Sequence, residues 1–491
     1  MKLSLLYFVF CIASVALRAQ TTLQWSDSLL IDSTTRPITS PRIALLPDGT
    51  PLITWGISGD FGNSTSQIWC SRFENGAFTT PIGVVQAPEE PLLYGFGGYD
   101  VAVSDSQVFI VFEQQQQGIF LARSDDSGST FGSPTLVQGT VSGGYAILSS
   151  IIVDGTGNPV VSYIQYKNGT ASYEVRRSPD GGFNFEPSVM GNAPAPGGEV
   201  CECCISDLLA SGDSIWLLFR NNNQNRRDIW VSRSTDLAAT FDTATDVDAT
   251  DWQLDFCPVA GPRMARSGDS LITVWMSAAN GTSRVYLNTL HSGTMQAGFQ
   301  LDFPTPSAPQ TAQGQADVAA VQDTIGMVFV ENSKEIVFHF STLGAAGLPA
   351  QSTRFAVPDH TLHLPSIEFR NRVFHLVYSD PTAGQVLYRQ GVLTGSSSVN
   401  AEIQQQRVVV FPNPLNLNTL LTVKMNLIQA GDVNFELQDA SGKVVQTYCF
   451  PGEQSGDRVF SLKTAGLPPG VYFLRSYLGG KVLGVEKVIL K

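Results

Sequence analysis

Charged residues are scarce in this chain, and long helical hydrophobic periodicity is nearly absent. The 491 residues include 30 lysines and arginines against 43 aspartates and glutamates, a formal net charge of −13. Nucleic acids and anionic membranes both need basic surfaces, so we expect neither as a partner. Beyond the N-terminus no apolar run approaches the roughly 18 residues of a membrane-spanning helix, so we expect no transmembrane segment.

The first 19 residues are typical of a signal peptide. Lys2 gives a short positive region, and the apolar stretch 3–17 is too short to span a membrane comfortably. We expect cleavage after Ala19, which leaves Gln20 as the first mature residue. Cys11 has no small residues before it, so lipoprotein cleavage is not expected.

What is plentiful points to an all-β protein with large cores. Hydrophobic residues make up 43% and aromatic residues 10%, while 45 glycines and 27 prolines provide many turns. Short strands and turns recur at a period of roughly 50–57 residues, with about four strands in each unit. This period is typical of a β-propeller blade.

Seven units are marked by a hydrophobic strand that ends in an aromatic residue. These aromatic residues are Trp55, Phe112, Tyr163, Phe219, Trp275, Phe329 and Tyr378. We therefore predict seven blades, with six as the alternative. The seventh unit lacks a fourth strand, and residues 21–32 are predicted to supply it. The alternative is a free N-terminal arm.

Three turns fit an Asp-box pattern, S-x-D-x-G-x-T-F. The first two contain Ser124, Asp126, Gly128 and Phe131, then Ser178, Asp180, Gly182 and Phe185. The third contains Ser234, Asp236 and Phe241, with Ala238 in place of glycine. Serine and aspartate side chains satisfy backbone groups in such turns, and glycine permits a positive φ.

On these boxes, residues 20–395 resemble the sialidase-like, Asp-box (BNR repeat) β-propeller superfamily. The resemblance implies the fold and leaves the function open, because the boxes lie on the rim, away from the active face. Sialidase chemistry would need an arginine triad, a tyrosine nucleophile and acidic partners. Arg42-Ile43 resembles the family's first-strand R-I-P, although Ala44 replaces the proline. Tyr286 is a possible nucleophile, but no glutamate can be placed beside it from the sequence. The other possible guanidinium donors are Arg220, Arg227, Arg263 and Arg284.

The end of the chain forms a separate module. Residues 396–408 read as a linker, and residues 409–491 alternate like a small Ig-like β-sandwich. Its marks are Pro412, Asn413, Pro414, Gly442, Gly470, Tyr472 and Lys487. The module closely resembles the type A C-terminal sorting domain of the type IX secretion system of Bacteroidota. The alternative is a carbohydrate-binding module.

The sorting resemblance implies a route and a partner. It predicts export through the periplasm and outer membrane by the type IX machinery. It also predicts removal of the sorting domain, followed by release or attachment at the outer cell surface.

Polar loops follow the aromatic markers and lie on the same predicted face as the loops that enter each unit. Such loops on a rigid scaffold suit recognition of a glycan or protein, although solvated turns would look the same. The candidate residues on this face are Glu113, Arg220, Arg227, Asp228 and Arg263.

Four cysteines form the sharpest local pattern. Cys201, Cys203 and Cys204 precede unit four, and Cys257 precedes unit five at the same offset from its turn as Cys201. We expect a disulfide between the two units, and a thiolate site for zinc or Cu(I) is the alternative. Together with Arg227-Asp228-Ile229, the pattern resembles one in poorly characterised sialidase-like secreted proteins. No other cofactor is predicted.

Two further features are considered for other roles, a pair of histidines and one more cysteine. His360 and His363 could hold a metal, but a strand-entry loop with two polar rings fits them better. Cys70 is expected to be a buried core thiol. The sequence as a whole predicts a secreted binding or interaction module. A sialidase-type glycoside hydrolase and a structural surface component are the alternatives.

Overall fold

The computed structural model describes most of the chain as two units. The described residues are 22–59, 65–85, 90–115, 117–303, 311–350, 352–394, 409–415, 419–427, 430–439, 443–454, 456–478 and 481–491. The predicted signal peptide, the linker 396–408 and Gly442 lie outside them. Contacts separate a large unit, Thr22–Thr394, from a C-terminal unit that includes Gly395–Lys491.

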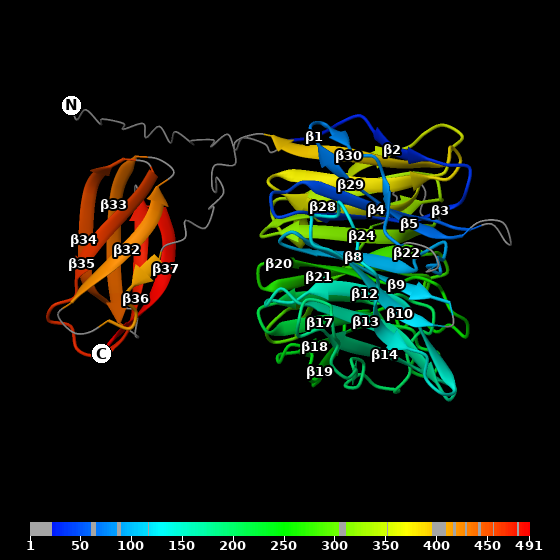
Figure 1. The fold of residues 1–491 in the computed structure, drawn as a ribbon, viewed down its shortest axis with the longest axis horizontal. Coiled ribbons are helices and arrows are strands. Elements are labelled where there is room, and N and C mark those ends of the chain that lie inside the picture. Colours follow the sequence, from blue (N-terminus) through cyan, green and yellow to red (C-terminus); the bar gives the residue numbers. More distant parts are fainter. Residues whose placement is uncertain are drawn as a thin grey trace, which may run out of the picture. The chain divides into compact units, whose positions relative to one another are not determined.

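The large unit consists of seven successive antiparallel sheets (Figure 1). The first three contain β3 (Ile38–Leu45), β4 (Pro51–Ile57), β5 (Gln67–Glu74), β6 (Ala77–Phe78) and β7 (Ile82–Gly83); β8 (Tyr99–Ser104), β9 (Gln107–Gln114), β10 (Gly118–Ser124) and β11 (Thr135–Gly139); and β12 (Gly144–Val153), β13 (Pro159–Lys167), β14 (Thr170–Arg177) and β15 (Val189–Met190).

Sheets four to six repeat this order. They contain β16 (Asp207–Ser211), β17 (Ser214–Arg220), β18 (Ile229–Ser234) and β19 (Thr243–Asp246); β20 (Arg263–Ser267), β21 (Ser270–Ser277), β22 (Arg284–His291) and β23 (Ala297–Asp302); and β24 (Gln313–Val321), β25 (Thr324–Glu331), β26 (Glu335–Ser341) and β27 (Ser352–Phe355). A 3-10 helix, η1 (Ala345–Ala350), precedes β27. Among the described residues, no helix is long and apolar enough to cross a membrane.

The seventh sheet joins the two ends of the large unit. It contains β28 (His363–Arg370), β29 (Val373–Asp380) and β30 (Gln385–Thr394), with β1 (Thr22–Trp25) and β2 (Leu29–Ser33) paired to β30. Trp25 lies opposite Gly391, and Leu29 lies opposite Tyr388. The N-terminal segment therefore completes the last sheet, as the sequence predicts.

The second strand of each sheet is the most buried one, because neighbouring sheets cover both of its faces. In β4 every residue is buried, and β9 is buried from Val108 onward. This is why these strands read as continuous apolar runs rather than as alternating patterns. The aromatic markers such as Trp55 and Phe112 are completely buried in them.

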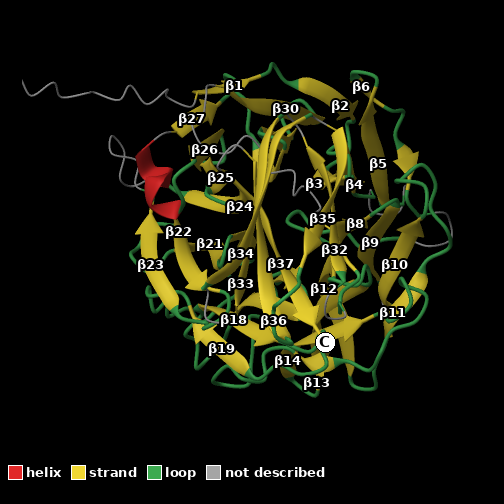
Figure 2. Cartoon of the chain, turned by 90° about the vertical axis from the view of Figure 1, so that its left-hand side faces the viewer, coloured by secondary structure: helices red, strands yellow, loops and turns green. Residues whose placement is uncertain are grey.

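Seven apolar clusters hold the sheets together, and each draws on two consecutive sheets. One cluster, for example, joins Leu52 of sheet one to Ile110 of sheet two. Another joins Trp55 of sheet one to Tyr388 of sheet seven. Figure 2 shows the sheets arranged around a common centre. The first strands of consecutive sheets contact one another, and β28 contacts β3.

The C-terminal unit has two sheets that share one core. Its strands are β31 (Val409–Phe411), β32 (Leu420–Leu427) and β35 (Gly456–Lys463) in one sheet, and β34 (Val444–Glu453), β33 (Gly431–Asp439), β36 (Gly470–Leu478) and β37 (Lys481–Leu490) in the other. Val423 and Phe460 from the first sheet pack with Phe435 and Leu474 from the second.

Candidate functional site

A ring of polar side chains lines the centre of the large unit. Each of the seven first strands contributes the residue that pairs with the position just before an aromatic marker. These residues are Arg42, Asp100, Ser150, Asp207, Arg263, Asp317 and Ser366. All but Ser150, whose hydroxyl is hydrogen-bonded to Ser162 and Ser206, line the central cavity. Because these positions are equivalent in the seven sheets, the strand register brings residues that are far apart in sequence to one level around the centre. We call this ring of residues the belt.

Opposite charges within this belt connect neighbouring sheets. Arg42 Nε lies 3.8 Å from Asp100 Oδ1, and Arg263 Nη1 lies 3.6 Å from Asp207 Oδ1. Three backbone N–H groups of the next sheet donate to the aspartates. They are Ile151 to Asp100 at 3.2 Å, Met264 to Asp207 at 2.7 Å and Ile367 to Asp317 at 3.0 Å. Each of these aspartates therefore links two neighbouring sheets through a hydrogen bond and also faces the centre.

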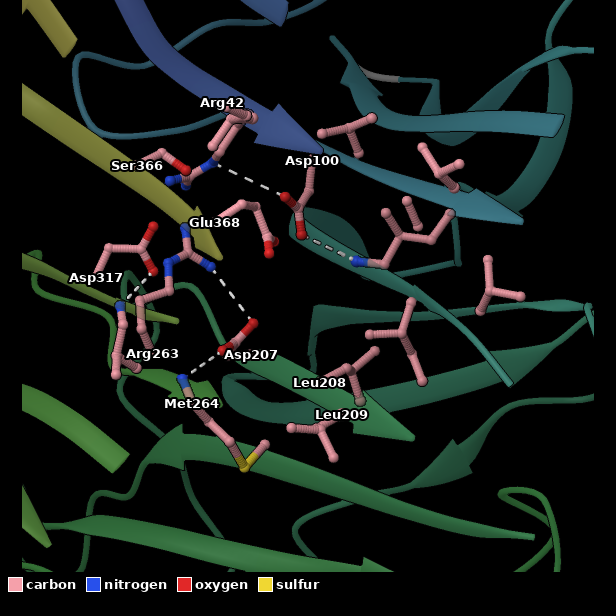
Figure 3. Close-up of a pocket in the computed structure, with 18 of the residues that line it drawn as sticks. Arg42, Asp100, Asp207, Leu208, Leu209, Arg263, Met264, Asp317, Ser366 and Glu368 are labelled. Carbon is pink, nitrogen blue, oxygen red and sulfur yellow. Dashed lines mark hydrogen bonds and ion pairs between the residues drawn. The ribbon is translucent and has the colours of Figure 1, made fainter. Parts of the chain in front are cut away.

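The belt encloses a cavity of about 360 Å³ that all seven first strands line. Figure 3 shows Glu368, two residues beyond Ser366, pointing into the same space as Asp100 and Arg263. Burial, with the nearby Asp317 charge, raises the pKa of Glu368 to about 8. Burial also raises the pKa of Asp207 to about 6, although Arg263 opposes the shift. A protonated Glu368 thus faces an ion-paired belt at neutral pH.

A second cavity, of about 300 Å³, lies beside the start of β12. It is lined by Glu113, Gln115, Gly118, Thr140, Tyr145, Ala146 and Ile147. The Tyr94 hydroxyl donates to Glu113 Oε2 at 2.9 Å. Burial raises the pKa of Glu113 to about 7, against the hydrogen bonds from Tyr94 and from the Leu148 backbone. We call this cavity the Glu113 pocket.

Tyr145 is the aromatic residue of the pocket lining, and Tyr94 contacts Glu113 through its hydroxyl. Tyr145 stacks on Tyr166 with 5.1 Å between ring centroids, and its side chain is 48% exposed. Tyr94 stacks on Phe96 at 5.5 Å. Burial raises the pKa of Tyr145, and the charges of Tyr166, Glu202 and Glu113 add to the shift. The pocket therefore combines an accessible ring with a buried carboxyl group whose pKa is raised.

The four cysteines come together between sheets four and five. Cys203 and Cys257 form a disulfide, with 6.2 Å between their Cα atoms. Cys201 Sγ lies 2.8 Å from Cys204 Sγ and 3.5 Å from Cys257 Sγ. The covalent link joins the loop that enters sheet four to the loop that enters sheet five, the two units that the sequence indicated. Cys70 is buried elsewhere, and burial raises its thiol pKa to about 12.

Three residues of the predicted ligand face support the cysteine loops from inside. Arg220 is completely buried, and its guanidinium donates to the carbonyls of Ala260, Arg227 and Met276. Arg227 donates to the Leu254 carbonyl at 2.9 Å.

Asp228, the third of these residues, accepts a 3.0 Å hydrogen bond from Trp252 N and an ion pair from Arg226. The structure places Arg220, Arg227 and Asp228 among backbone groups, Glu113 in its own pocket and Arg263 in the central belt.

The Asp-box residues act within their own turns. Asp126 accepts hydrogen bonds from Ser124 Oγ, Thr130 N and Thr130 Oγ1, and Gly128 N donates to Ser124 Oγ. The same bonds recur at Ser178 with Asp180 and Gly182, and at Ser234 with Asp236. Ala238 adopts the left-handed conformation with φ 67°, as Gly128 and Gly182 do. Phe131, Phe185 and Phe241 pack into the clusters between sheets.

The residues considered for other chemistries have separate partners. His360 Nδ1 lies 2.7 Å from Asp380 Oδ2, whereas His363 Nδ1 faces Gln315 Nε2 at 3.5 Å. Tyr286 stacks on Trp275, and its hydroxyl accepts from Asn280 Nδ2 at 3.2 Å. The ion pairs of Arg42 and Arg263 with aspartates leave less positive charge for a substrate carboxylate.

The sorting marks tie the last strand to the start of the C-terminal unit. Asn413 Nδ2 donates to the Lys487 carbonyl at 2.6 Å, and Ile489 N donates to Asn413 Oδ1 at 2.9 Å. The Tyr472 hydroxyl donates to the Pro468 carbonyl at 2.8 Å. Gly470 pairs with Leu490, and Pro412 and Pro414 flank Asn413 and are exposed.

Sequence reasoning missed most of the residues that line the two cavities. Tyr94, Tyr145 and Glu368 carry no repeated pattern. The belt does carry a repeated pattern, because Asp100, Asp207 and Asp317 each lie twelve residues before the aromatic marker of their own unit. A comparison of the units at that offset would have found them.

Residues 409–491 match the family described as secretion system C-terminal sorting domain. The type IX sorting domain predicted from the sequence is thereby confirmed. It marks the chain for export to the cell surface or the extracellular space. No curated protein matches the sequence.

Several solved structures are similar to this chain at low identity. A protein of unknown function from Dyadobacter fermentans is 9% identical, with a TM-score of 0.45, over 76% of this chain and 99% of that one. An intramolecular trans-sialidase from Ruminococcus gnavus is 11% identical, with a TM-score of 0.42, over 74% and 96%.

PorZ, a surface component of the type IX secretion system of Porphyromonas gingivalis, is 12% identical, with a TM-score of 0.40, over 92% and 59%. None of these low-scoring similarities bears on the ligand of this chain.

Proposed function

We propose that the chain is an exported seven-bladed β-propeller that binds a neutral carbohydrate in the Glu113 pocket. In this proposal the seven sheets are the blades, and the C-terminal unit is an Ig-like sandwich that is removed after export. The observation that carries it is the exposed Tyr145 ring beside the buried Glu113 carboxyl group.

This pairing suits the two kinds of surface on a sugar. The C–H face of a pyranose ring packs on an exposed aromatic ring, and its hydroxyl groups donate to a carboxylate or accept from a protonated carboxyl. A pocket of about 300 Å³ is at the small end of the range for ligand sites. Glu113 and the net charge of −13 disfavour an anionic sugar.

The test is binding of the purified full-length chain to a panel of neutral glycans, followed by calorimetry on the best ligand. Tyr145→Ala should weaken binding at least about tenfold, because interface aromatics often contribute more than 1 kcal/mol. The matched control is Phe183→Ala, which removes a 61% exposed ring from an Asp-box turn. Equal affinities of the Tyr145 variant and the unmodified chain would contradict the proposal.

A glycoside hydrolase is the second candidate, and the central cavity favours it. Burial keeps the Glu368 carboxyl group protonated at neutral pH, and Glu368 lies close enough to Asp317 for their charges to interact. Acid catalysis uses pairs of carboxyl groups whose environments give them different roles. Turnover of fluorogenic glycosides that Glu368→Gln abolishes would support this reading. A chain that neither binds nor cleaves glycans would instead fit a structural surface component.

A further inference from the structure

The four cysteines form a compact set of sulfur atoms. The Sγ atoms of Cys201, Cys203, Cys204 and Cys257 all lie within 4.8 Å of one another. In a tetrahedral zinc site with Zn–S bonds of about 2.3 Å, neighbouring sulfurs are about 3.8 Å apart. The 3.5 Å between Cys201 Sγ and Cys257 Sγ is close to that spacing. The disulfide uses two of these four sulfurs, and the other two are completely buried beside it.

The surroundings of the sulfurs suit thiolate ligands. The backbone N–H groups of Cys203 and Ala260 lie near the sulfurs of Cys201 and Cys204, where they lower the pKa of these thiols. Hydrogen bonds of this kind orient ligands and stabilise their negative charge. Cys203 and Cys257 are partly exposed, so an ion could reach the site from their side.

A buried positive charge lies next to the same sulfurs. Arg220 is completely buried, and the buried carboxylate of Asp248 lies close enough for the two charges to interact. Its guanidinium hydrogen-bonds to three carbonyls and lies over the Trp252 ring at 5.3 Å. A buried cation is stabilised by nearby negative charge, and four thiolates around one divalent ion, with a net charge of −2, would add to that of Asp248.

We propose that the four cysteines, when reduced, bind one thiophilic d10 cation, Zn²⁺ or Cu⁺, between sheets four and five. Binding releases the protons of those cysteines that were thiols. The Cys203–Cys257 disulfide is then the oxidised, metal-free form of the site. Its reduction takes two electrons and two protons from a dithiol, which itself becomes a disulfide. Four sulfur ligands form a closed set, so the role of the ion is structural.

The experiment is a metal titration of the full chain. The protein is reduced with a dithiol, freed of reductant without oxygen and titrated with Co²⁺, whose thiolate charge-transfer and tetrahedral bands report the ligands. Zn²⁺ and Cu⁺ are then added in competition. We expect one ion per chain, displaced by at least one of the two. Cys204→Ser should lower the affinity at least tenfold, whereas Cys449→Ser, which removes the exposed thiol of the C-terminal unit, should leave it unchanged.

Two results would overturn the proposal. One is a reduced chain that binds no cobalt, which needs no variant to interpret. The other is equal affinity in Cys204→Ser and the unmodified chain. If Cys204→Ser does not fold, judged by tryptophan fluorescence, Cys257→Ser takes its place, because its side chain lies at the partly exposed edge of the cluster.

Discussion

Two carboxylates of the large unit, Asp126 on the rim and Glu113 in its pocket, have opposite environments. Burial of Asp126 would raise its pKa, but hydrogen bonds from Thr130 and Ser124 lower the pKa to about 2. Burial of Glu113 raises its pKa to about 7, because one hydroxyl and one backbone N–H offset only part of the desolvation. Asp126 is exposed and has three donors, whereas Glu113 is buried with two, so the depth of burial and the number of donors together decide which carboxylate stays ionised.

This difference distinguishes acidic residues that stabilise a turn from acidic residues that can bind a ligand in this chain. The partners of Asp126 all lie within four residues of it, and they occupy both of its oxygens. The surroundings of Glu113 come from residues farther away in sequence, because its hydrogen-bond partner is Tyr94 and its pocket is lined by Tyr145. We therefore expect the stability of the Asp-box turns to depend on local hydrogen bonds. The loops that carry the Glu113 pocket and the cysteine bridge should instead depend on contacts between residues far apart in sequence.

The largest expected effect comes from removal of the Cys203–Cys257 disulfide. Replacing Cys203 by serine in the oxidised, metal-free chain should lower the free energy of unfolding by about 4 kcal/mol, because the bridge closes a loop of 54 residues. All seven tryptophans lie in the large unit, so denaturation followed by tryptophan fluorescence measures it separately. Cys449→Ser is the control, and equal midpoints for the two variants would refute the role of the bridge.

The next effect tests the burial of Glu113 through its pH dependence. The pKa is raised from 4.5 to about 7, so the folded state binds the proton more tightly and loses stability as the pH rises between these values. Glu113→Gln should therefore stabilise the large unit by up to about 3 kcal/mol at pH ~8, and hardly at pH ~4.

The control for this prediction is Glu199→Gln, because Glu199 is exposed. Thermal unfolding at the two pH values is the measurement. A Glu113→Gln variant with the same stability difference at both pH values would show that the carboxyl group is not desolvated.

On the rim, removal of one Asp-box carboxylate should have a smaller effect. Asp126→Ala leaves Thr130 N and Thr130 Oγ1 without their acceptor, at a cost of about 2 kcal/mol in the free energy of unfolding. Asp126→Asn retains one acceptor and should recover part of the loss. Denaturant midpoints that are unchanged in the alanine variant would break the contrast between rim and pocket.

The smallest effect concerns the hydroxyl that contacts Glu113. Tyr94→Phe keeps the stacking on Phe96 but removes the donor, so the pKa of Glu113 should rise by about one further unit. The shift is worth about 1 kcal/mol at neutral pH. It appears as a displaced midpoint in the pH dependence of stability. A midpoint that moves downward instead would mean that the hydroxyl does not stabilise the ionised form.

The sequence by itself determined the features that short-range chemistry controls. The aromatic-ended strands, the Asp-box turns and the sorting marks each depend on residues a few positions apart. The pairing of β1 and β2 with β30 followed from counting strands, since the last unit lacked one. The location of the cysteine bridge followed from equal offsets in two units, whereas the choice of Cys203 over Cys201 needed atomic distances.

Only the tertiary structure decided which polar side chains face a cavity. Arg220 and Glu113 both directly follow the aromatic marker of a buried strand. The Arg220 guanidinium nevertheless donates to three carbonyls, whereas Glu113 lines a pocket. Glu368 acquires its raised pKa from the sheets packed around it, and none of its own neighbours in sequence predicts that. Desolvation depends on the depth that packing creates, and depth is a property of the assembled sheets rather than of any one strand.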